Sequence, residues 1–145
     1  MNIENKVKTI SLENKRELKK NNDKINLEWL IKKNQIQYIN RLFLNEELNN
    51  PEQYLEREIN KKIKSYLQQD KHKNIYENTS TITYEEVLVK LIESKLCCYY
   101  CKKDIYVIYD KKLQQNQWTL DRTNNYDGHS DKNTVICCLH CNIKK

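Results

Sequence analysis

The stretch WTLDRTNNYDGHSDKNTVICCLHCN, residues 118–142, decides the fold expected for this chain. It contains the chain's one glycine, two of its three histidines and three of its six cysteines, with several Asp and Asn residues among them. The chain before it is rich in Lys, Asn and Ile and has far fewer potential metal ligands. We therefore expect a compact, ligand-rich module at this end of the chain.

Two C-x2-C pairs frame this stretch. Cys98 and Cys101 form the first pair, Cys138 and Cys141 form the second, and 36 residues lie between them. Two residues between cysteines allow a tight knuckle to direct both thiolates at one tetrahedral ion, and two such knuckles complete a closed site typical of structural zinc. The ion would tie the segment before Cys98 to the end of the chain and supply part of the folding energy.

Neighbouring residues leave alternatives for the ligand set. Cys97 and Cys137 also create C-x3-C pairs, but we prefer the shorter spacing and expect these two residues to be packed thiols. His140 lies inside the second pair and could replace a fourth ligand, although such a residue more often faces solvent or a phosphate. His72 has no motif around it.

Composition limits the class of protein. The 145 residues are 38% hydrophobic and 32% charged, with one Gly and one Pro, which favours a mostly helical chain. The core of such a chain is small and needs additional stabilisation, for example a bound metal ion. No apolar run suits a membrane span or a signal peptide, so we expect an intracellular protein whose clustered cysteines bind metal. The net charge of +6 is consistent with a nucleic-acid partner, and equally with a solvated surface in an Asn/Lys-biased sequence.

The pattern predicts an α+β fold. A mostly helical N-terminal region of unknown role, residues 1–81, precedes a small zinc-stapled module, residues 82–145. Asn50 and Pro51 have the signature of a helix start, and Thr83 and Glu86 have the spacing of a capping box. The expected helices cover 27–43, 50–70 and 83–95, the expected strands cover 104–110, 117–121 and 134–138, and a last helix begins near 141. Residues 71–81 are expected to be a linker, and residues 11–20 to be disordered or a frayed helix.

Two polar residues in the module have notable positions. Asp121 ends a predicted strand, and Asn142 begins the last helix directly after the final cysteine. If the strand and helix pack together, the carboxylate and amide oxygens can share one Mg²⁺ and leave room for water and a substrate phosphate. Asp and Asn are common in loops, so it is their placement that carries this hypothesis.

The ordered pattern C-x2-C, W-x-L-D-R-x-x-N, G-H-x-x-x-N and C-x2-C-N resembles the zinc-bearing HNH endonucleases of the His-Me finger, or ββα-metal, superfamily. It looks closest to a subgroup found in large DNA viruses and phages. The resemblance covers about residues 82–145. It implies a ββα-metal module that hydrolyses DNA phosphodiester bonds with Mg²⁺ or Mn²⁺.

The resemblance assigns roles to individual residues. Asp121 matches the metal-binding Asp at the end of the first strand, and Asn142 matches the second metal ligand. Asn133 matches the middle Asn, which braces the loop through backbone hydrogen bonds. The position after the metal-binding Asp, where the family carries its general base, is Arg122 here.

Arginine stays protonated and does not act as an ordinary base, so Arg122 is expected to clamp the scissile phosphate. His129 is the nearest replacement as base or metal-site residue, because its unperturbed pKa suits proton abstraction from water. The alternative is a purely structural role, in which His129 caps the turn at Gly128. The last helix has only three residues after Asn142, and a single turn is marginal unless the zinc holds it.

The expected partner is the phosphate backbone of DNA, entered from the minor groove, and no membrane contact or oligomeric state is predicted. The candidate phosphate-contacting side chains are Arg122, Lys102, Lys103, Lys111, Lys112, Lys144 and Lys145. Two rival functions remain: a non-catalytic zinc module that binds nucleic acid, and a protein-interaction adaptor in which the helices matter and zinc is a staple. The N-terminal helices could supply target recognition, although their alternating charges favour a solvated or partner-binding face.

Overall fold

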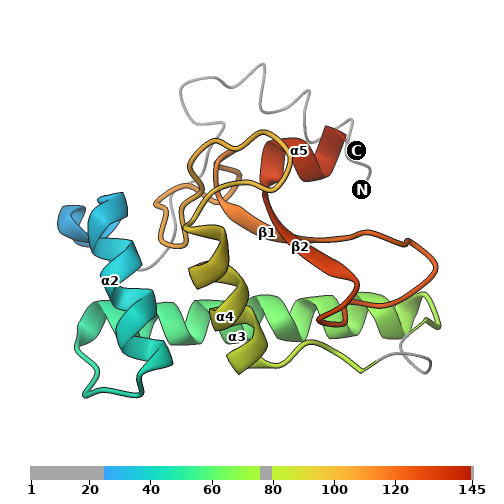
Figure 1. Ribbon diagram of the computed structural model, residues 1–145, viewed down its shortest axis with the longest axis horizontal. Coiled ribbons are helices and arrows are strands. Elements are labelled where there is room, and N and C mark those ends of the chain that lie inside the picture. Colours follow the sequence, from blue (N-terminus) through green and yellow to red (C-terminus); the bar gives the residue numbers. More distant parts are fainter. Residues whose placement is uncertain (1–24, 76–79, 145) are drawn as a thin grey trace.

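The computed structural model describes residues 25–75 and 80–144, and it has the α+β class that the sequence predicts (Figure 1). The expected segment at 11–20 lies outside the described residues. In chain order the elements are η1 (Leu27–Leu30), α2 (Lys32–Phe43), α3 (Asn50–His72), α4 (Tyr84–Ser94), β1 (Trp118–Arg122), β2 (Thr134–Cys138) and α5 (Leu139–Lys144).

The helix ends follow local rules, with small corrections. Thr83 caps α4 and forms the predicted capping box with Glu86. At the start of α3 the cap is Asn49 rather than the expected Asn50, so that Pro51 falls inside the first turn. The expected helix at 27–43 is broken at Ile31, whose backbone is extended. Helix α3 continues to His72, slightly beyond its expected end.

The sheet is a two-stranded antiparallel hairpin in which Trp118 pairs with Cys138 and Arg122 pairs with Thr134. Two of the three predicted strands are therefore confirmed, and α5 follows β2 directly. The third prediction, a strand over 104–110, is wrong. This segment makes only isolated bridges, because the buried side chain of Gln35 in α2 takes the backbone groups that a neighbouring strand would bind.

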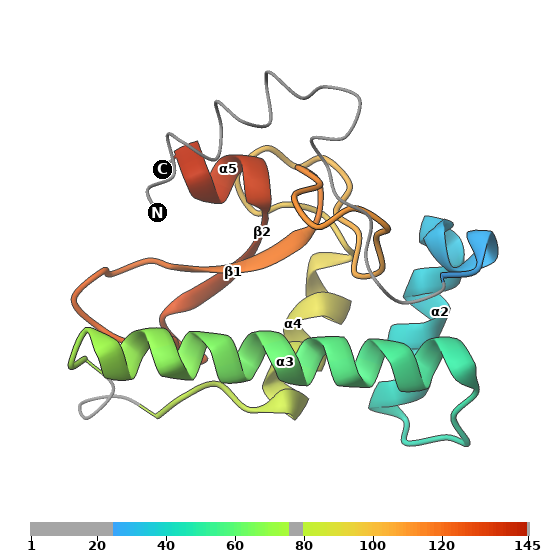
Figure 2. The ribbon, with the colours of Figure 1, turned by 180° about the vertical axis from the view of Figure 1, so that it is seen from behind.

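One hydrophobic core runs through the described residues and crosses the expected boundary between residues 81 and 82. It includes Leu55 and Ile59 from α3, Leu91 from α4 and Trp118 and Ile136 from the sheet. Helix α3 extends along the length of the molecule beneath the sheet, and α4 crosses one side of α3 and contacts β2 (Figures 1 and 2). The N-terminal helices therefore support the C-terminal module directly.

Two side chains of α3 reach the outer edge of β1. The Tyr66 hydroxyl accepts a hydrogen bond from the Leu120 backbone N–H at 3.1 Å, and the Lys62 ammonium donates to the Trp118 carbonyl. The Lys62 ammonium also lies 4.5 Å from the Trp118 ring centroid. Burial lowers the pKa of Lys62 to about 7. Unpaired backbone groups at the edge of a sheet can pair with another chain, and these contacts cover that edge of β1.

Replacing Gln35 by Leu is expected to cost about 3 kcal/mol of unfolding free energy, because buried polar groups left without partners cost about 1–3 kcal/mol each. The fully buried Gln35 amide accepts from the N–H groups of Val107 and Ile108 and donates to the carbonyls of Trp29 and Ile108. Urea unfolding measures the effect, with the exposed Gln37→Leu as control. Equal losses in the two variants would contradict the bridging role of Gln35.

In the part of the chain that the structure describes, none of the helices combines the length and apolar character that crossing a membrane requires.

Candidate metal centre and adjoining carboxylate

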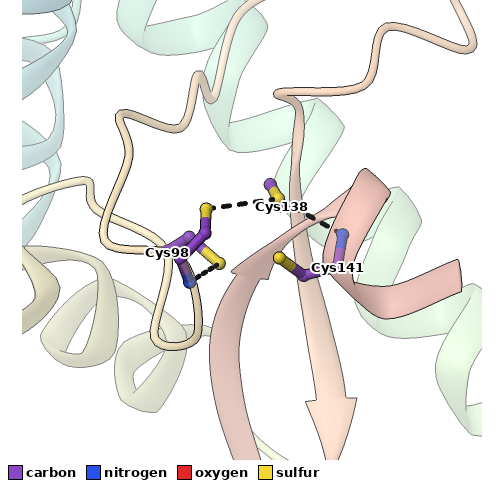
Figure 3. A group of neighbouring side chains, drawn as sticks. Cys98, Cys138 and Cys141 are labelled. Carbon is purple, nitrogen blue, oxygen red and sulfur yellow. Dashed lines mark hydrogen bonds between the residues drawn. The ribbon is translucent and has the colours of Figure 1, made fainter. Parts of the chain in front are cut away.

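Four cysteine side chains meet at one end of the sheet. The sulfur atoms of Cys98, Cys101, Cys138 and Cys141 all lie within 4.8 Å of one another. Cys98 and Cys101 come from the turn after α4, Cys138 ends β2, and Cys141 lies in α5. Figure 3 shows the side chains of Cys98, Cys138 and Cys141 around a common space. This cluster could hold a metal ion such as zinc, and it selects the C-x2-C register over the C-x3-C register.

Backbone N–H groups point at the sulfur atoms. Cys98 Sγ accepts from the N–H groups of Tyr100 and Cys101 at 3.4 and 3.5 Å, and Cys138 Sγ accepts from the N–H of Cys141 at 3.4 Å. Burial raises the pKa of the Cys98 thiol, but these donors outweigh burial and bring it down to about 6. Burial and the neighbouring thiols raise the pKa of Cys138 and Cys141. If all four groups were thiolates, they would repel one another at this distance unless a cation such as zinc lay among them.

The two remaining cysteines lie outside the cluster. Cys137 is fully buried, its sulfur lies 3.3 Å from the Thr119 hydroxyl, and burial raises its pKa to about 12, so it is a packed thiol as predicted. Cys97 is only partly buried and contacts the Lys32 ammonium. His140 is exposed and does not belong to the cluster.

Asp121 lies in β1 beside the first cysteine pair. Its carboxyl group is buried, and Oδ2 accepts a hydrogen bond from the Tyr100 hydroxyl at 2.5 Å. Burial and the bond to Asp121 raise the pKa of Tyr100, so the phenol stays protonated and acts as the donor. The knuckle that holds Cys98 and Cys101 therefore also orients the Asp121 carboxylate.

Asn142 reaches the same strand from α5. Its amide nitrogen donates to the Thr119 hydroxyl at 3.0 Å and to the Leu120 carbonyl at 3.5 Å. Thr119 and Asp121 are two residues apart in β1 and share one face of the sheet. The packing of strand against helix that the sequence analysis required is thus present, because α5 contacts β1.

Asn133 organises the loop between β1 and β2. Its amide nitrogen donates to the carbonyls of Asn124 and Gly128, each at 2.9 Å. Its amide oxygen accepts from the Thr123 hydroxyl and the Asn124 N–H, also at 2.9 Å. Four hydrogen bonds from one buried side chain give the loop a fixed shape.

Arg122 contributes to the same loop. Its Nη1 donates to the carbonyls of Asn125 and Asp127 at 3.0 and 3.2 Å. The guanidinium thus braces the loop backbone through one of its nitrogens. This contact was not expected from the sequence, which suggested only a phosphate clamp.

His129 is buried against α3. Asp70 accepts from the His129 backbone N–H at 2.6 Å and lies 2.8 Å from the ring Nδ1, while the Tyr66 ring stacks on the imidazole at a centroid distance of 4.5 Å. Burial lowers the pKa of His129 more than Asp70 raises it, so the ring is neutral near pH 7. Because a carboxylate only accepts, the proton sits on Nδ1 and Nε2 is the basic nitrogen.

Replacing Asp70 by Ala is expected to cost about 3 kcal/mol of stability, because two buried donors of His129 lose their acceptor and each such group costs about 1–3 kcal/mol. Hydrogen exchange should show the His129 amide losing its protection first. The exposed neighbour Gln69, changed to Ala, should leave both quantities near wild type. An Asp70→Ala protein with unchanged exchange at His129 would refute this link.

The candidate DNA-contacting lysines lie on the surface. Lys102 and Lys103 follow the first cysteine pair, and Lys102 donates to the Tyr99 carbonyl at 2.6 Å with its ammonium 5.0 Å from the Tyr99 ring centroid. Lys144 is exposed in α5, and Lys145 is outside the described residues. Lys111 and Lys112 are exposed in the segment before β1.

Sequence reasoning missed Tyr66, Asp70 and Tyr100. Tyr66 and Asp70 follow Lys62 at intervals of four residues on α3, so they lie on one face of that helix. That spacing is a usable signal, but the apolar pattern on the same helix is the stronger one. Tyr100 is one of the two residues between Cys98 and Cys101, and nothing in the C-x2-C pattern indicates its contact with Asp121.

Comparison of the chain with models of protein families, curated proteins and solved structures finds no match. The assignment of function therefore rests on the chain's own residues and geometry.

Proposed function

We propose that this protein is a metal-dependent endonuclease of the HNH type, which hydrolyses phosphodiester bonds of DNA. The observation that carries the proposal is the placement of two polar side chains beside the four clustered cysteines. Asn142 in α5 bonds to Thr119, and Thr119 shares one face of β1 with Asp121, which Tyr100 of the first cysteine pair contacts. The chain order β1, β2 and α5 supports the ββα arrangement that the sequence motif implies.

The four cysteines are assigned to a structural zinc ion. Four thiolates satisfy a tetrahedral ion completely and leave no position for water or substrate, so this site serves folding rather than chemistry. It fixes α5 against β2 and the first knuckle, and α5 has only six residues. A helix that short is not stable by itself, so the ion would keep Asn142 in place.

Asp121 and Asn142 are assigned to a Mg²⁺ or Mn²⁺ ion. Their oxygen atoms are the ligand type that such hard cations prefer, and two protein ligands leave positions for water and phosphate. The ion would stabilise the charge that develops on the scissile phosphate and the leaving 3′ oxygen. Tyr100 and Thr119 hold the two ligand side chains by the hydrogen bonds described above.

His129 is the candidate general base, and Nε2 is the atom that would accept the proton of the attacking water. The contact between Nδ1 and Asp70 would stabilise the imidazolium that results, because a carboxylate favours a nearby cation. Arg122 keeps the loop in shape through Nη1, and its positive charge would offset charge on the phosphate.

DNA contact is assigned to the exposed lysines around the cysteine cluster, Lys102, Lys103 and Lys144. Lysine contacts to phosphates give affinity that falls with salt concentration and depends little on sequence. A small ββα unit fits the minor groove, where such contacts are within reach of both backbones.

The second candidate is a zinc module that binds nucleic acid without cleaving it. Two observations favour it: the position after Asp121 is an arginine that braces a loop, and His129 is buried and clamped by Asp70. It shares the zinc and the DNA contacts with the first candidate, but gives no role to the oxygen ligands of Asp121 and Asn142.

Incubating the zinc-loaded protein with supercoiled plasmid separates the candidates. If the protein is a nuclease, the plasmid is nicked or linearised with Mg²⁺ or Mn²⁺. It stays intact with EDTA, in an incubation short enough to leave the zinc bound. Folded protein that shifts DNA in a gel and leaves it intact with either cation would decide for the non-catalytic module.

A further inference from the structure

The knuckle formed by residues 98–103 does more than present two thiols. A backbone bond from the Cys98 N–H to the Lys103 carbonyl closes it at 2.8 Å. Tyr100 lies between its two cysteines and places its hydroxyl on Asp121 Oδ2. Tyr99, the neighbouring residue, points elsewhere and meets the Tyr100 ring edge-on at a centroid distance of 5.2 Å.

We propose that Tyr100 is a positioning residue, which holds the Asp121 carboxylate in the orientation that binds the divalent cation. The inference rests on the proposed function, because it needs a cation at Asp121 and Asn142. It adds a direct link between the thiolate cluster and the oxygen ligands through one phenol.

The contacts around Asp121 support this role. A carboxylate can turn about its last torsion, and the short bond from Tyr100 to one Asp121 oxygen fixes that torsion. Tyr100 is itself anchored, because its backbone N–H donates to Cys98 Sγ. The Asn142 amide is fixed in the same manner by Thr119. Both proposed ligands therefore have their own hydrogen-bonding support.

Partners that orient metal ligands typically contribute about 10- to 100-fold to metal affinity. We accordingly expect Tyr100→Phe, which removes only the hydroxyl, to weaken Mn²⁺ binding by about tenfold or more. Tyr99→Phe removes an equivalent hydroxyl from the same knuckle and should leave the affinity unchanged. Tyr100 is 41% exposed, so the loss of its hydroxyl should not disturb the core.

The test is titration of zinc-loaded protein with Mn²⁺, followed by the electron paramagnetic resonance of the free ion, without DNA. Wild type, Tyr100→Phe, Tyr99→Phe and Asp121→Ala are compared, and their zinc content is measured to show that the knuckle is intact. The proposal is supported if Mn²⁺ binding is weaker in Tyr100→Phe and unchanged in Tyr99→Phe.

Equal affinity of wild type and Tyr100→Phe, with binding lost in Asp121→Ala, would overturn the role of Tyr100 and leave the nuclease proposal standing. Wild-type protein that binds no Mn²⁺, or that binds it as well after Asp121→Ala, would overturn both. Equal weakening of Mn²⁺ binding in the two tyrosine variants would also overturn the role of Tyr100, because the effect would then belong to the knuckle as a whole.

Discussion

Cys98→Ser should lose its bound zinc and most of its C-terminal structure, whereas Cys97→Ser should keep both. The two residues are adjacent, but only the Cys98 sulfur belongs to the group of four. Zinc binding contributes about 10–16 kcal/mol in zinc-finger peptides near pH 7. This energy is as large as the whole free energy of unfolding of a typical domain, which is roughly 5–15 kcal/mol. The loss of one thiolate should therefore decide whether α5 and the knuckle fold.

Elemental analysis gives the zinc content of the two variants, and thermal unfolding followed by circular dichroism gives their stability. One zinc per chain is expected in wild type and in Cys97→Ser. A Cys98→Ser protein with full zinc content and unchanged melting would show that the ligand set is wrong. The same would follow if Cys97→Ser lost its metal.

The second large effect is expected at Asp121. In the plasmid assay, Asp121→Ala should lower the cleavage rate by roughly 10²- to 10³-fold, the loss typical when one group that supports transition-state charge is removed. Zinc content should not change, because the carboxylate is not among the clustered ligands. Asp131→Ala is the matched control, since this exposed carboxylate lies in the β1–β2 loop and pairs with Lys90 at 3.4 Å.

Cleavage by Asp121→Ala at the rate of the control would exclude the carboxylate from the reaction. A loss of the same size in both variants would point to the loop rather than to a metal ligand. Salt concentration must be held constant, because affinity for the DNA backbone depends on it.

Local signals predicted the parts of the fold that local chemistry controls. The capping box at Thr83 and Glu86 fixes the start of α4. The short β-like runs QWTLD and TVICC predicted both strands of the hairpin. The two-residue spacing of the cysteine pairs selected the four residues that meet in space. Each of these depends on residues only a few positions apart.

Contacts between distant residues could not be predicted in this way. The segment at 104–110 alternates like a strand, but Gln35, 72 residues before Val107, takes its backbone groups. His129 meets Asp70 across 59 positions, and this contact ties the buried candidate base to α3. The bond between Tyr100 and Asp121 spans 21 positions and depends on the knuckle geometry. A single sequence has no periodicity that reveals such pairs.

Anomalous diffraction from crystals grown with zinc and soaked in Mn²⁺ tests whether the protein has two neighbouring metal sites of different chemistry. Data collected at the zinc and manganese absorption edges would locate each element. We predict zinc at about 2.3 Å from the sulfur atoms of the four cysteines. We also predict manganese bound by oxygen atoms of Asp121 and Asn142. Manganese absent from these residues, or zinc placed outside the cysteine cluster, would contradict the two-site arrangement.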